Sequence, residues 1–514
     1  MVGRLQQGRK EICPVRRVFR VVRAGAEDAD RYPLTVGGSK SLRTEDRGCV
    51  VAMKRGNSRG AKATQEDGCE MTRRRDYTPE TVPFAATPAG KPPAIEQWAN
   101  SFVWTDRMLA TLRSGGVRGG KWHTLIDKVF SPHNLMAASG HVIGNQGAAG
   151  VDHQSTSDFA LRECEELRLL EHELRTDTYR PRAIRRVWIP KPGSREQRPL
   201  GIPTVRDRVV QTALLHVLEP IFDATFAEHS YGFRHGRGCH HALEQVEASL
   251  KDGYVHVVDA DLKGYFDSIP HDRLLAAVAE KVSDRRVLAL VQMFLKQGIL
   301  DGLSEWTPEE GSPQGAVISP LLSNLYLNPL DHLVSESGFR MVRYADDFVI
   351  LCRTREDAER ALDLVRAWVA DNGLTLHPTK TKIVNATTEG FDFLGYTFRG
   401  NLRLPRTKSE QKFKDGVREL THRCNGHSLR VQCVLLKPKL QGWFQYFRHC
   451  HWSVFRDLDG WIRMRLRSIL RKRQKKRGRG RGPDHQTWTN KFFAEHGLYS
   501  LGAAHTRVCQ SSPR

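Results

Sequence analysis

The alternation of apolar and polar residues divides the chain into strand-like and helix-like segments. Apolar residues at every second position indicate strands, whereas apolar residues spaced three and four apart indicate one face of a helix. The clearest strand is 255–262 and the clearest helix is 355–371. Further strand-like runs lie at 180–203, 339–351 and 391–398, and a mainly helical region runs from Pro405 to about Leu470. This mixture predicts an α+β fold built on an antiparallel sheet.

The first 93 residues differ in texture from the rest of the chain. Residues 1–93 contain few hydrophobic residues and many Arg, Gly, Ser and Thr residues. A segment of this kind cannot bury enough apolar surface to offset the entropy of ordering, so we expect it to be weakly structured. Residues 94–175 show helical spacing around a glycine-rich loop at 147–152, where the backbone can approach a phosphate closely.

Adjacent carboxylates stand between two apolar, strand-like runs. Asp346 and Asp347 follow the first run and precede the second, which predicts a tight hairpin turn. Two like charges side by side require neutralisation, and a hard divalent cation such as Mg²⁺ prefers carboxylate oxygens. The simpler alternative is an exposed Asp-Asp turn.

A third carboxylate favours the metal interpretation. Asp259 and Asp261 end the strand at 255–262 and point to one face of it. If this strand neighbours the hairpin in one antiparallel sheet, three carboxylates meet. Such a trio suits two metal ions about 3.5–4 Å apart that act on an in-line phosphoryl displacement. Of the two strand residues we favour Asp261.

Positive and glycine-rich segments nearby fit a nucleotide substrate. Residues 180–203 form a basic hairpin containing Lys191 and Arg198, which is suited to triphosphate or template phosphates. Gln314 lies in a glycine-rich turn at 311–315, where the backbone can come close to a nucleotide. Together these features are more specific than any one of them.

Composition supports a polyanionic partner. The 514 residues carry a formal net charge of +22 with a pI near 9.7, which indicates nucleic acid or an acidic membrane surface. There is no run of about 18 apolar residues that would span a bilayer. The ten cysteines include no Cys-x-x-Cys pair, so we expect free thiols and no structural zinc. From these features we expect a soluble, cytosolic protein; the family resemblance described below further implies a bacterial, nucleoid-associated one.

Aromatic and basic residues gather in the last hundred residues. The aromatic side chains between Trp443 and Trp461 predict the core of a helical domain, with only a few rings free to contact RNA. The run 471–481 is dense in Arg and Lys and is expected to be a flexible, non-specific nucleic-acid contact with steep salt dependence.

The motifs, taken in order, resemble those of group II intron-encoded reverse transcriptases, which are also maturases. The resemblance covers the chain from about Trp98 to its C-terminus. Its most specific elements are the segments 147–152, 186–191, 198–211, 230–234, 259–267, 312–315, 344–347, 373–376, 393–396 and 442–447.

The resemblance implies a right-hand polymerase with fingers, palm and thumb. The implied division is an N-terminal extension at 1–93, a fingers extension at 94–175, fingers and palm at 176–400, a helical thumb or maturase domain at 401–470, and a basic DNA- and RNA-binding segment at 471–514.

The resemblance also implies roles for individual residues. Asp261, Asp346 and Asp347 would bind two Mg²⁺ ions, with the backbone carbonyl of Leu262 as a further ligand, and Phe266 would exclude a ribose 2′-hydroxyl. The expected dNTP contacts are Lys191, Arg198, Gln314 and Lys380, together with Phe266. The expected RNA contacts are Trp443, Tyr446, Arg471, Lys472 and Arg473.

The implied function is RNA-dependent DNA synthesis combined with splicing and retrohoming of a group II intron. The partners would be intron RNA, target DNA and dNTPs, with no membrane, and the oligomeric state stays open, a dimer being one option. Alternatives are a domesticated or defence-associated reverse transcriptase, or an RNA-binding splicing factor with a vestigial polymerase site. Departures from the family pattern are Ser312, Ala149 and His153, and no HNH endonuclease motif with paired cysteines is expected.

Overall fold

The computed structural model describes residues 95–117, 119–190, 197–424, 426–476, 478, 480 and 482–511. All of them belong to one of the two compact units of the chain. The predicted disorder of residues 1–93 lies outside the described residues, and so does Lys191. Within the described part, no helix is long and apolar enough to cross a membrane.

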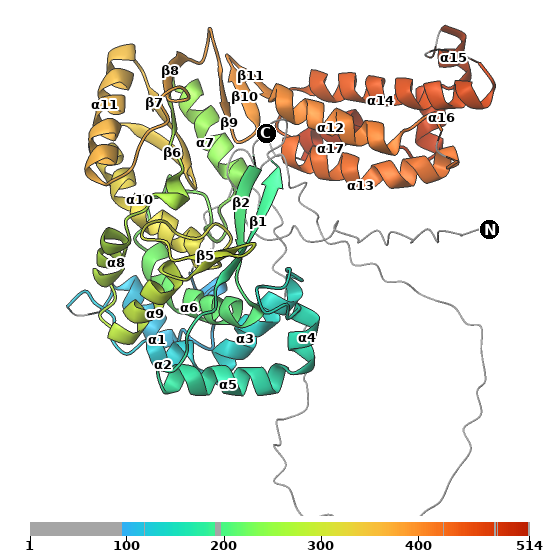
Figure 1. Cartoon of the computed structure of the whole chain (residues 1–514). Helices are drawn as coiled ribbons and strands as arrows, with labels where there is room; N and C mark the ends of the chain where they lie inside the picture. Colours follow the sequence, from blue (N-terminus) through green and yellow to red (C-terminus); the bar gives the residue numbers. More distant parts are fainter. Residues whose placement is uncertain are drawn as a thin grey trace, which may run out of the picture. The chain divides into compact units, whose positions relative to one another are not determined.

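Helices form the N-terminal part of this unit (Figure 1). The capping box of Ser155 and Asp158 starts α4, and a break at Arg162 separates α4 from α5. The elements are η2 (Ile95–Gln97), α1 (Asp106–Arg113), α2 (Ile126–Val129), α3 (Pro132–Gly144), α4 (Thr156–Leu161), α5 (Glu163–Arg175) and α6 (Val205–Asp223). Their apolar faces bury against α6, which is buried along most of its length.

A four-stranded sheet with the order β2-β1-β4-β5 follows. Strands β1 (Ile184–Pro190) and β2 (Gln197–Ile202) form the predicted basic hairpin, in which Arg186 pairs with Gly201 and Trp188 with Pro199. Strands β4 (Ile299–Asp301) and β5 (Ser304–Trp306) were not predicted from the sequence. Each has only three residues, which is too short for alternation to be recognised.

A second four-stranded sheet, β6-β7-β3-β8, is buried on both faces. It contains β3 (His256–Asp261), β6 (Arg340–Tyr344), β7 (Asp347–Cys352) and β8 (Lys382–Asn385). In β3, Val258 and Ala260 belong to one apolar core, whereas Val257 belongs to a second core. The first core is completed by helices α8 (His271–Ala279), α9 (Arg285–Leu295), α10 (Ser319–Glu336) and α11 (Arg355–Asp371). The bounds of α11 match the prediction.

The second core joins the sheet to the C-terminal helices. It contains residues of α7 (Cys239–Lys251), of α12 (Thr407–Leu420), α13 (Leu429–Phe447) and α14 (Trp452–Arg473), and of the strands β9 (Phe391–Phe393) and β10 (Tyr396–Arg399). These two strands form a three-stranded sheet with β11 (Leu402–Pro405). The short helices η3 (Tyr265–Asp267), α15 (Gly482–Thr487) and α16 (Asn490–Glu495), and the longer α17 (Leu501–Ser511), complete the list.

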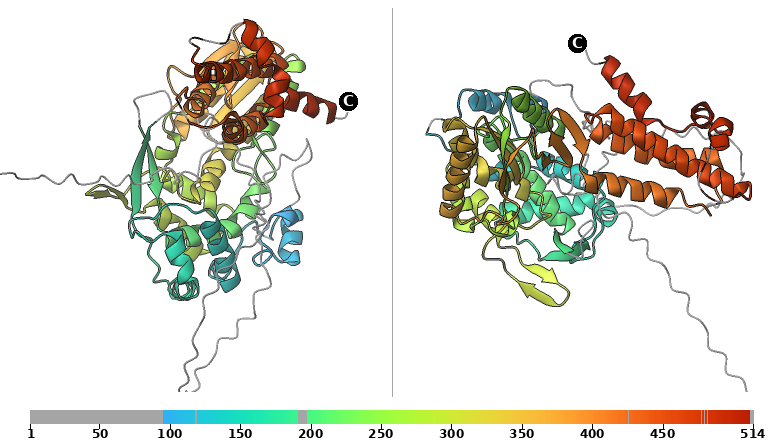
Figure 2. Two further views of the ribbon diagram at one scale, coloured as in Figure 1. Left: turned by 90° about the vertical axis from the view of Figure 1, so that its right-hand side faces the viewer. Right: turned by 90° about the horizontal axis from the view of Figure 1, so that it is seen from above.

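The C-terminal residues form part of the helical domain. Trp488, Phe493 and Leu501 are buried in the second core with α13 and α14, and the two views of Figure 2 show α17 beside these helices. The Asp459 carboxylate of α14 accepts hydrogen bonds from the backbone N–H groups of Leu501 and Gly502, at 3.0 and 3.1 Å, and so fixes the start of α17. The helical domain therefore extends past residue 470, where we predicted its boundary.

Candidate active site

The strand register places two of the predicted carboxylates directly opposite each other. Asp261, the last residue of β3, pairs with Asp347, the first residue of β7. Directly opposed residues of antiparallel strands have Cβ atoms about 4.5–5.5 Å apart. Because side chains alternate, Asp259, Asp261 and Asp347 point to the face of the sheet that carries Val257 and Val349 of the second core.

The third carboxylate stands in the turn between β6 and β7. Tyr344 pairs with Asp347, so Ala345 and Asp346 are the two turn residues. Ala345 has a φ of +59°, a left-handed conformation that a residue with a Cβ adopts only when its surroundings enforce it. The turn therefore brings Asp346 beside Asp347 as the sequence predicted.

The electrostatics of the site disfavour negative charge in the absence of a cation. Burial, followed by repulsion from Asp259, Asp346 and Asp261, raises the pKa of Asp347 well above its usual range. Burial likewise raises the pKa of Asp259 to about 6, although Lys382 opposes the change. The Oδ2 atom of Asp347 is buried and has no hydrogen-bond partner within the described residues. An unsatisfied carboxylate oxygen at this position fits a site that receives a positive ligand.

Two lysines of the segment around β8 face the carboxylates of β3. Lys380 Nζ lies 3.1 Å from Asp261 Oδ2, and Lys382 Nζ lies 3.9 Å from Asp259 Oδ2. The Asp261 backbone carbonyl accepts a hydrogen bond from His377 N at 2.7 Å, and Leu262 forms a β-bridge with Leu376. Lys380 thus lies at the carboxylates as an ion-pair partner of Asp261, and its predicted contact with a dNTP stays a prediction.

The carboxylates of Asp261 and Asp347 fit a magnesium ion that takes its remaining ligands from water and substrate. Among the described residues, no three His, Cys, Asp or Glu side chains converge closely enough to hold a metal ion by themselves. Mg²⁺ commonly binds one or two carboxylates and takes its other ligands from water and substrate phosphates. The opposed Asp261 and Asp347, with the buried unpartnered Oδ2, match that requirement.

A buried ion pair holds the hairpin in place. The side chains of Arg343 and Asp331 are both 0% exposed and are joined by hydrogen bonds of 2.7 and 2.5 Å. The same guanidinium donates to the carbonyl of Ala345 at 2.9 Å and to Asn324 Oδ1 at 2.8 Å. Asn324 in turn donates to the carbonyl of Gly232 at 2.8 Å. Helix α10 and the 230–232 segment are therefore bonded to the turn that carries Asp346.

The backbone of residues 229–232 lies against the hairpin. Tyr231 N donates to the Arg343 carbonyl at 2.9 Å, and Arg343 N donates to the His229 carbonyl at 3.0 Å. A Cβ on Gly232 would overlap the backbone nitrogen of Ala345. Residues 230–234 were recognised as a motif from the sequence, but the sequence did not explain why the motif contains a glycine. The structure gives the reason, because only glycine permits the close approach of this backbone to Ala345.

Two of the predicted nucleotide contacts, Phe266 and Gln314, are bonded at the 312–315 turn. Phe266 is 6% exposed, and its carbonyl accepts a hydrogen bond from Ser312 N at 2.6 Å. Gln314 Nε2 donates to Asp267 Oδ2 at 3.3 Å, and the Gln314 carbonyl accepts from Gly201 N at 2.7 Å. The turn thus connects the segment that follows Asp261 to the β1–β2 hairpin, in which Arg198 is half-buried.

Of the residues predicted to contact RNA, the two aromatic ones are buried and the three basic ones belong to a helix. Trp443 and Tyr446 are 8% and 5% exposed, and Tyr446 Oη donates to the Leu394 carbonyl at 2.8 Å. Their place in the core does not support direct contact with RNA. Arg471, Lys472 and Arg473 form the last turn of α14 instead of a flexible arm, and Arg471 pairs with Asp484 at 2.6 Å. Lys472 and Arg473 are exposed.

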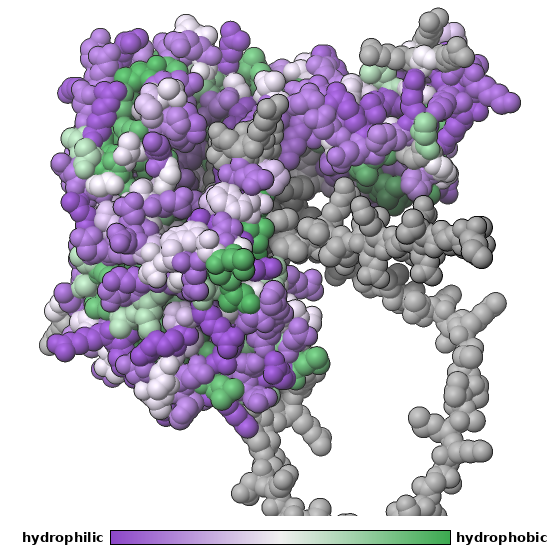
Figure 3. Space-filling model, viewed as in Figure 1, coloured by the Kyte–Doolittle hydropathy of each residue, from purple (hydrophilic) through white to green (hydrophobic). Residues whose placement is uncertain are grey.

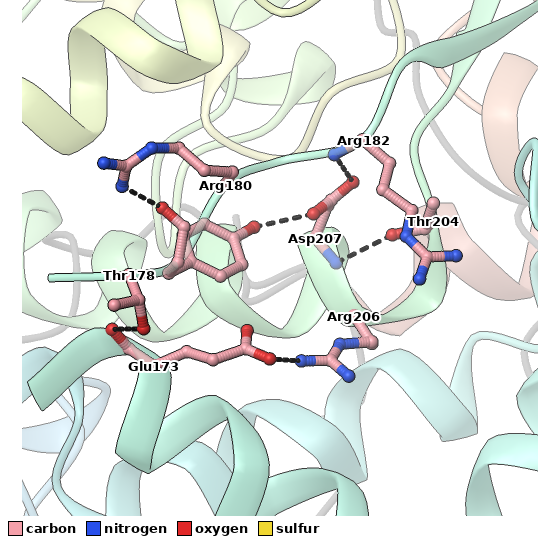
Figure 4. Close-up of a pocket in the computed structure, with 8 residues that line it drawn as sticks. Glu173, Thr178, Arg180, Arg182, Thr204, Arg206 and Asp207 are labelled. Carbon is pink, nitrogen blue, oxygen red and sulfur yellow. Dashed lines mark hydrogen bonds and ion pairs between the residues drawn. The ribbon is translucent and has the colours of Figure 1, made fainter. Parts of the chain in front are cut away.

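A cavity of about 200 Å³ lies apart from the carboxylates, between the end of α5 and the start of α6 (Figure 4). At its wall the Asp207 carboxylate accepts hydrogen bonds from Tyr179 Oη at 2.6 Å and from Arg182 N at 3.2 Å. Arg206 pairs with Glu173 at 2.7 Å. The polar groups that line the cavity are thus largely bonded to one another. The Arg206–Glu173 pair links α6 to α5, which is a structural role.

Comparison with known proteins identifies the family. Residues 189–398 match the family described as reverse transcriptase (RNA-dependent DNA polymerase), and residues 410–486 match the group II intron maturase-specific domain. Protein YkfC of Escherichia coli (strain K12) is 34% identical over 344 residues, which cover 58% of this chain and 90% of YkfC. The chain is a member of the group II intron-encoded reverse transcriptase/maturase family.

Other relatives of this reverse transcriptase/maturase are longer. The group II intron-encoded protein LtrA of Lactococcus lactis subsp. cremoris is 35% identical over 228 residues, and the match spans 42% of this chain and 37% of LtrA. A solved partial Cas6-RT-Cas1–Cas2 complex is 24% identical with a TM-score of 0.32, and the match covers 48% of this chain and 41% of that chain. A score this low supports no further conclusion.

The family assignment confirms the predicted right-hand polymerase fold and the activity class, RNA-directed DNA polymerase. The matched maturase-specific region extends to residue 486 and therefore crosses the predicted boundary at 470, as α14 does. The residues that the sequence did not reveal are those that position the site, Arg343, Asp331 and Asn324. Arg343 adjoins the predicted hairpin, but nothing in the sequence links it to Asp331.

We predict that Asp331→Ala destabilises this reverse transcriptase/maturase and reduces primer extension. The substitution leaves the Arg343 guanidinium buried without its counter-charge, which costs about 3–5 kcal/mol in comparable cases. Thermal unfolding measures the effect. The control is Asp252→Ala, which removes a 2.7 Å ion pair with Arg340, a residue on the same strand as Arg343. The side chains of Asp252 and Arg340 are 56% and 39% exposed, so the loss of unfolding free energy should be under about 1 kcal/mol. Equal shifts of the unfolding midpoint in both variants would contradict the conclusion that the Arg343–Asp331 ion pair holds the hairpin in place.

We also predict that Gly232→Ala displaces the hairpin turn. The added Cβ overlaps the backbone of Ala345, and overpacking of this kind costs about 1–3 kcal/mol. Primer extension should fall together with the midpoint of thermal unfolding. Gly238→Ala is the matched control, because a Cβ at Gly238 meets no atom within 4 Å. A wild-type rate in the Gly232 variant would refute the importance of this contact.

Proposed function

We propose that Asp261, Asp346 and Asp347 carry out RNA-templated DNA synthesis, and that the helical domain binds the intron RNA from which the protein derives. The observation that carries the proposal is the register that sets Asp261 directly opposite Asp347, with Asp346 in the adjoining turn. It is supported by the buried Asp347 Oδ2, which has no hydrogen-bond partner among the described residues, and by the family to which the chain belongs.

Two Mg²⁺ ions bound by these carboxylates and the Leu262 carbonyl would supply the positive charge that a transferring phosphoryl group requires. The protein's own contribution is to hold the carboxylates on rigid strands. Lys380, which pairs with Asp261 at 3.1 Å, is close enough to exchange that carboxylate for phosphate oxygens. Arg198 lies on the β1–β2 hairpin, which is bonded to the 312–315 turn through Gly201 N and the Gln314 carbonyl, and Gln314 Nε2 donates to Asp267 Oδ2 at 3.3 Å. In this proposal Lys191 contributes a further positive charge, although it lies outside the described residues.

The proposed substrates and partners are dNTPs, intron RNA and target DNA, and the work would take place at the bacterial nucleoid. RNA contact is assigned to exposed cations of the helical domain instead of to its buried aromatic rings. Arg430 and Lys437 of α13 and Lys472 and Arg473 of α14 are all exposed. Figure 3 shows that the visible face of α12 and α14 is mainly hydrophilic. Counter-ion release from such contacts makes binding weaken as salt rises.

The test of the proposal is the double variant Asp346→Ala/Asp347→Ala. Primer extension on an RNA template should fall to background, whereas binding of intron RNA should change by less than about twofold, because the helical domain is untouched. Asp363→Ala is the control, since this exposed aspartate of α11 forms an exposed ion pair with Arg366 on the same helix. Retained DNA synthesis in the double variant would overturn the assignment of the site. Absence of DNA synthesis by the wild-type protein would favour the alternative, an RNA-binding splicing factor with a vestigial polymerase site.

We further expect Phe266→Ala to weaken discrimination against ribonucleotides. The ring lies in η3, five residues after Asp261, and its backbone is fixed by the Ser312 hydrogen bond. Removal of the ring opens space for a 2′-hydroxyl. The ratio of rNTP to dNTP incorporation, measured as kcat/KM for each, should rise at least about tenfold, which corresponds to about 1.4 kcal/mol. An unchanged ratio would remove Phe266 from the proposed nucleotide site.

A further inference from the structure

Gln211 is a fully buried amide in the middle of helix α6. The residue is 0% exposed, and its neighbours on the helix, Val210 and Leu214, are equally buried and apolar. An apolar side chain would fill such a position without the cost of removing an amide from water, and a buried amide offsets that cost only through its hydrogen bonds. The bonds of Gln211 therefore show what the residue does.

The oxygen of the Gln211 amide is bonded to a distant backbone group. Gln211 Oε1 accepts a hydrogen bond from Val317 N at 2.7 Å, and the two residues are 106 positions apart in the chain. Val317 directly precedes α10 and lies in neither a helix nor a strand, so regular secondary structure offers its N–H group no partner. Gln211 Nε2 is buried and has no hydrogen-bond partner among the described residues. The contact with Val317 is thus the reason for an amide at this position.

This contact fixes one end of a loop whose other end is also bonded. We call residues 311–317 the 311–317 loop. At its first end the Gly311 carbonyl accepts a hydrogen bond from His271 Nε2 at 2.6 Å, and His271 is 6% exposed. At its second end Val317 is bonded to Gln211 of α6. Buried polar side chains therefore fix both ends of the loop.

The middle of the 311–317 loop carries Gln314 and packs closely against β2. Gly315 has a φ of +115°, and a Cβ on it would lie only 2.2 Å from the Gly201 carbonyl oxygen. The Gln314 side chain has a long hydrogen bond of 3.3 Å to Asp267, and its Oε1 atom has no hydrogen-bond partner among the described residues. The position of this side chain therefore depends on the backbone of the loop more than on bonds of its own.

We propose that Gln211 is a positioning residue for nucleotide addition, because its bond to Val317 fixes the end of the loop that presents Gln314 to the dNTP. Gln211 itself is buried and does not touch the nucleotide. Without the acceptor, Val317 N has to turn toward another partner, and the tight packing against β2 leaves Gln314, three residues earlier, little freedom to stay in place. This inference rests on the proposed polymerase function, in which Gln314 contacts the dNTP.

The experiment measures single-turnover primer extension on an RNA template, which separates the apparent Kd of the dNTP from the maximal rate. Gln211→Met keeps the length of the side chain and removes the acceptor. The apparent Kd of the dNTP should rise about tenfold, the size expected for one lost hydrogen bond, whereas the maximal rate and the affinity for primer–template should change by less than about threefold. If the methionine variant does not fold, Gln211→Asn, whose oxygen is withdrawn by one methylene, decides by the same measurement.

The matched control is Thr212→Val at the next position of α6. Thr212 is 6% exposed, and its hydroxyl donates to the Arg208 carbonyl at 2.7 Å, so its bond stays within the helix. The valine variant also loses a buried hydrogen bond and should lower the midpoint of thermal unfolding, but its apparent Kd for the dNTP should equal that of the wild type. The difference between the two variants separates positioning of the nucleotide from general destabilisation.

Failure of the inference and failure of the proposed function give different results. If the wild-type protein does not extend primers, the proposed function fails and the inference fails with it. If the wild type extends primers and the Gln211 variant keeps the wild-type Kd for the dNTP, only the inference fails. An equal rise of that Kd in Thr212→Val, or a fall in the maximal rate alone, would limit Gln211 to a structural role between α6 and α10 and would overturn the inference.

Discussion

The buried ion pair between Arg343 and Asp331 is the interaction on which the site depends. An unpaired charge in this position would be strongly unfavourable, so the two groups must stay together, and their separation is fixed by β6 and α10. Because Arg343 also donates to the Ala345 carbonyl, the pair holds a left-handed residue that would otherwise relax. The position of Asp346 and Asp347 is therefore determined by charges that have no part in the chemistry.

The sheet that carries the carboxylates is buried on both sides and therefore joins the two apolar cores. Val258 and Ala260 pack toward α10 and α11, whereas Val257 and Val349 pack toward β9–β11 and the C-terminal helices. The carboxylates lie at the end of the second face. The carboxylates therefore stand at the end of the same face of the sheet that packs against the helical domain.

The sequence predicted that the carboxylates lie close together, because the signal for their position is local. Asp261 ends a strand with clear alternation, and Asp346–Asp347 interrupts another, so strand geometry alone suggested their meeting. Asp331 and Arg343 could not be linked in this way, because their contact depends on the packing of α10 against β6. Strand β5, which contains Trp306, was missed for a different reason, since it has three residues. Composition alone does not distinguish a buried ring such as Tyr446 from an exposed one such as Trp188.

The hydrogen bonds of Asp459 to the first turn of α17 have a consequence for the order in which the protein is made. The palm strands end with β8 at Asn385, whereas Ala504, a buried residue of the helical core, is synthesised more than a hundred residues later. At about 5–20 residues per second, the ribosome needs roughly 6–24 seconds for that distance. The nascent chain can therefore complete its carboxylate sheet well before its helical domain closes, and α14 must wait for the last helix to emerge from the ribosome.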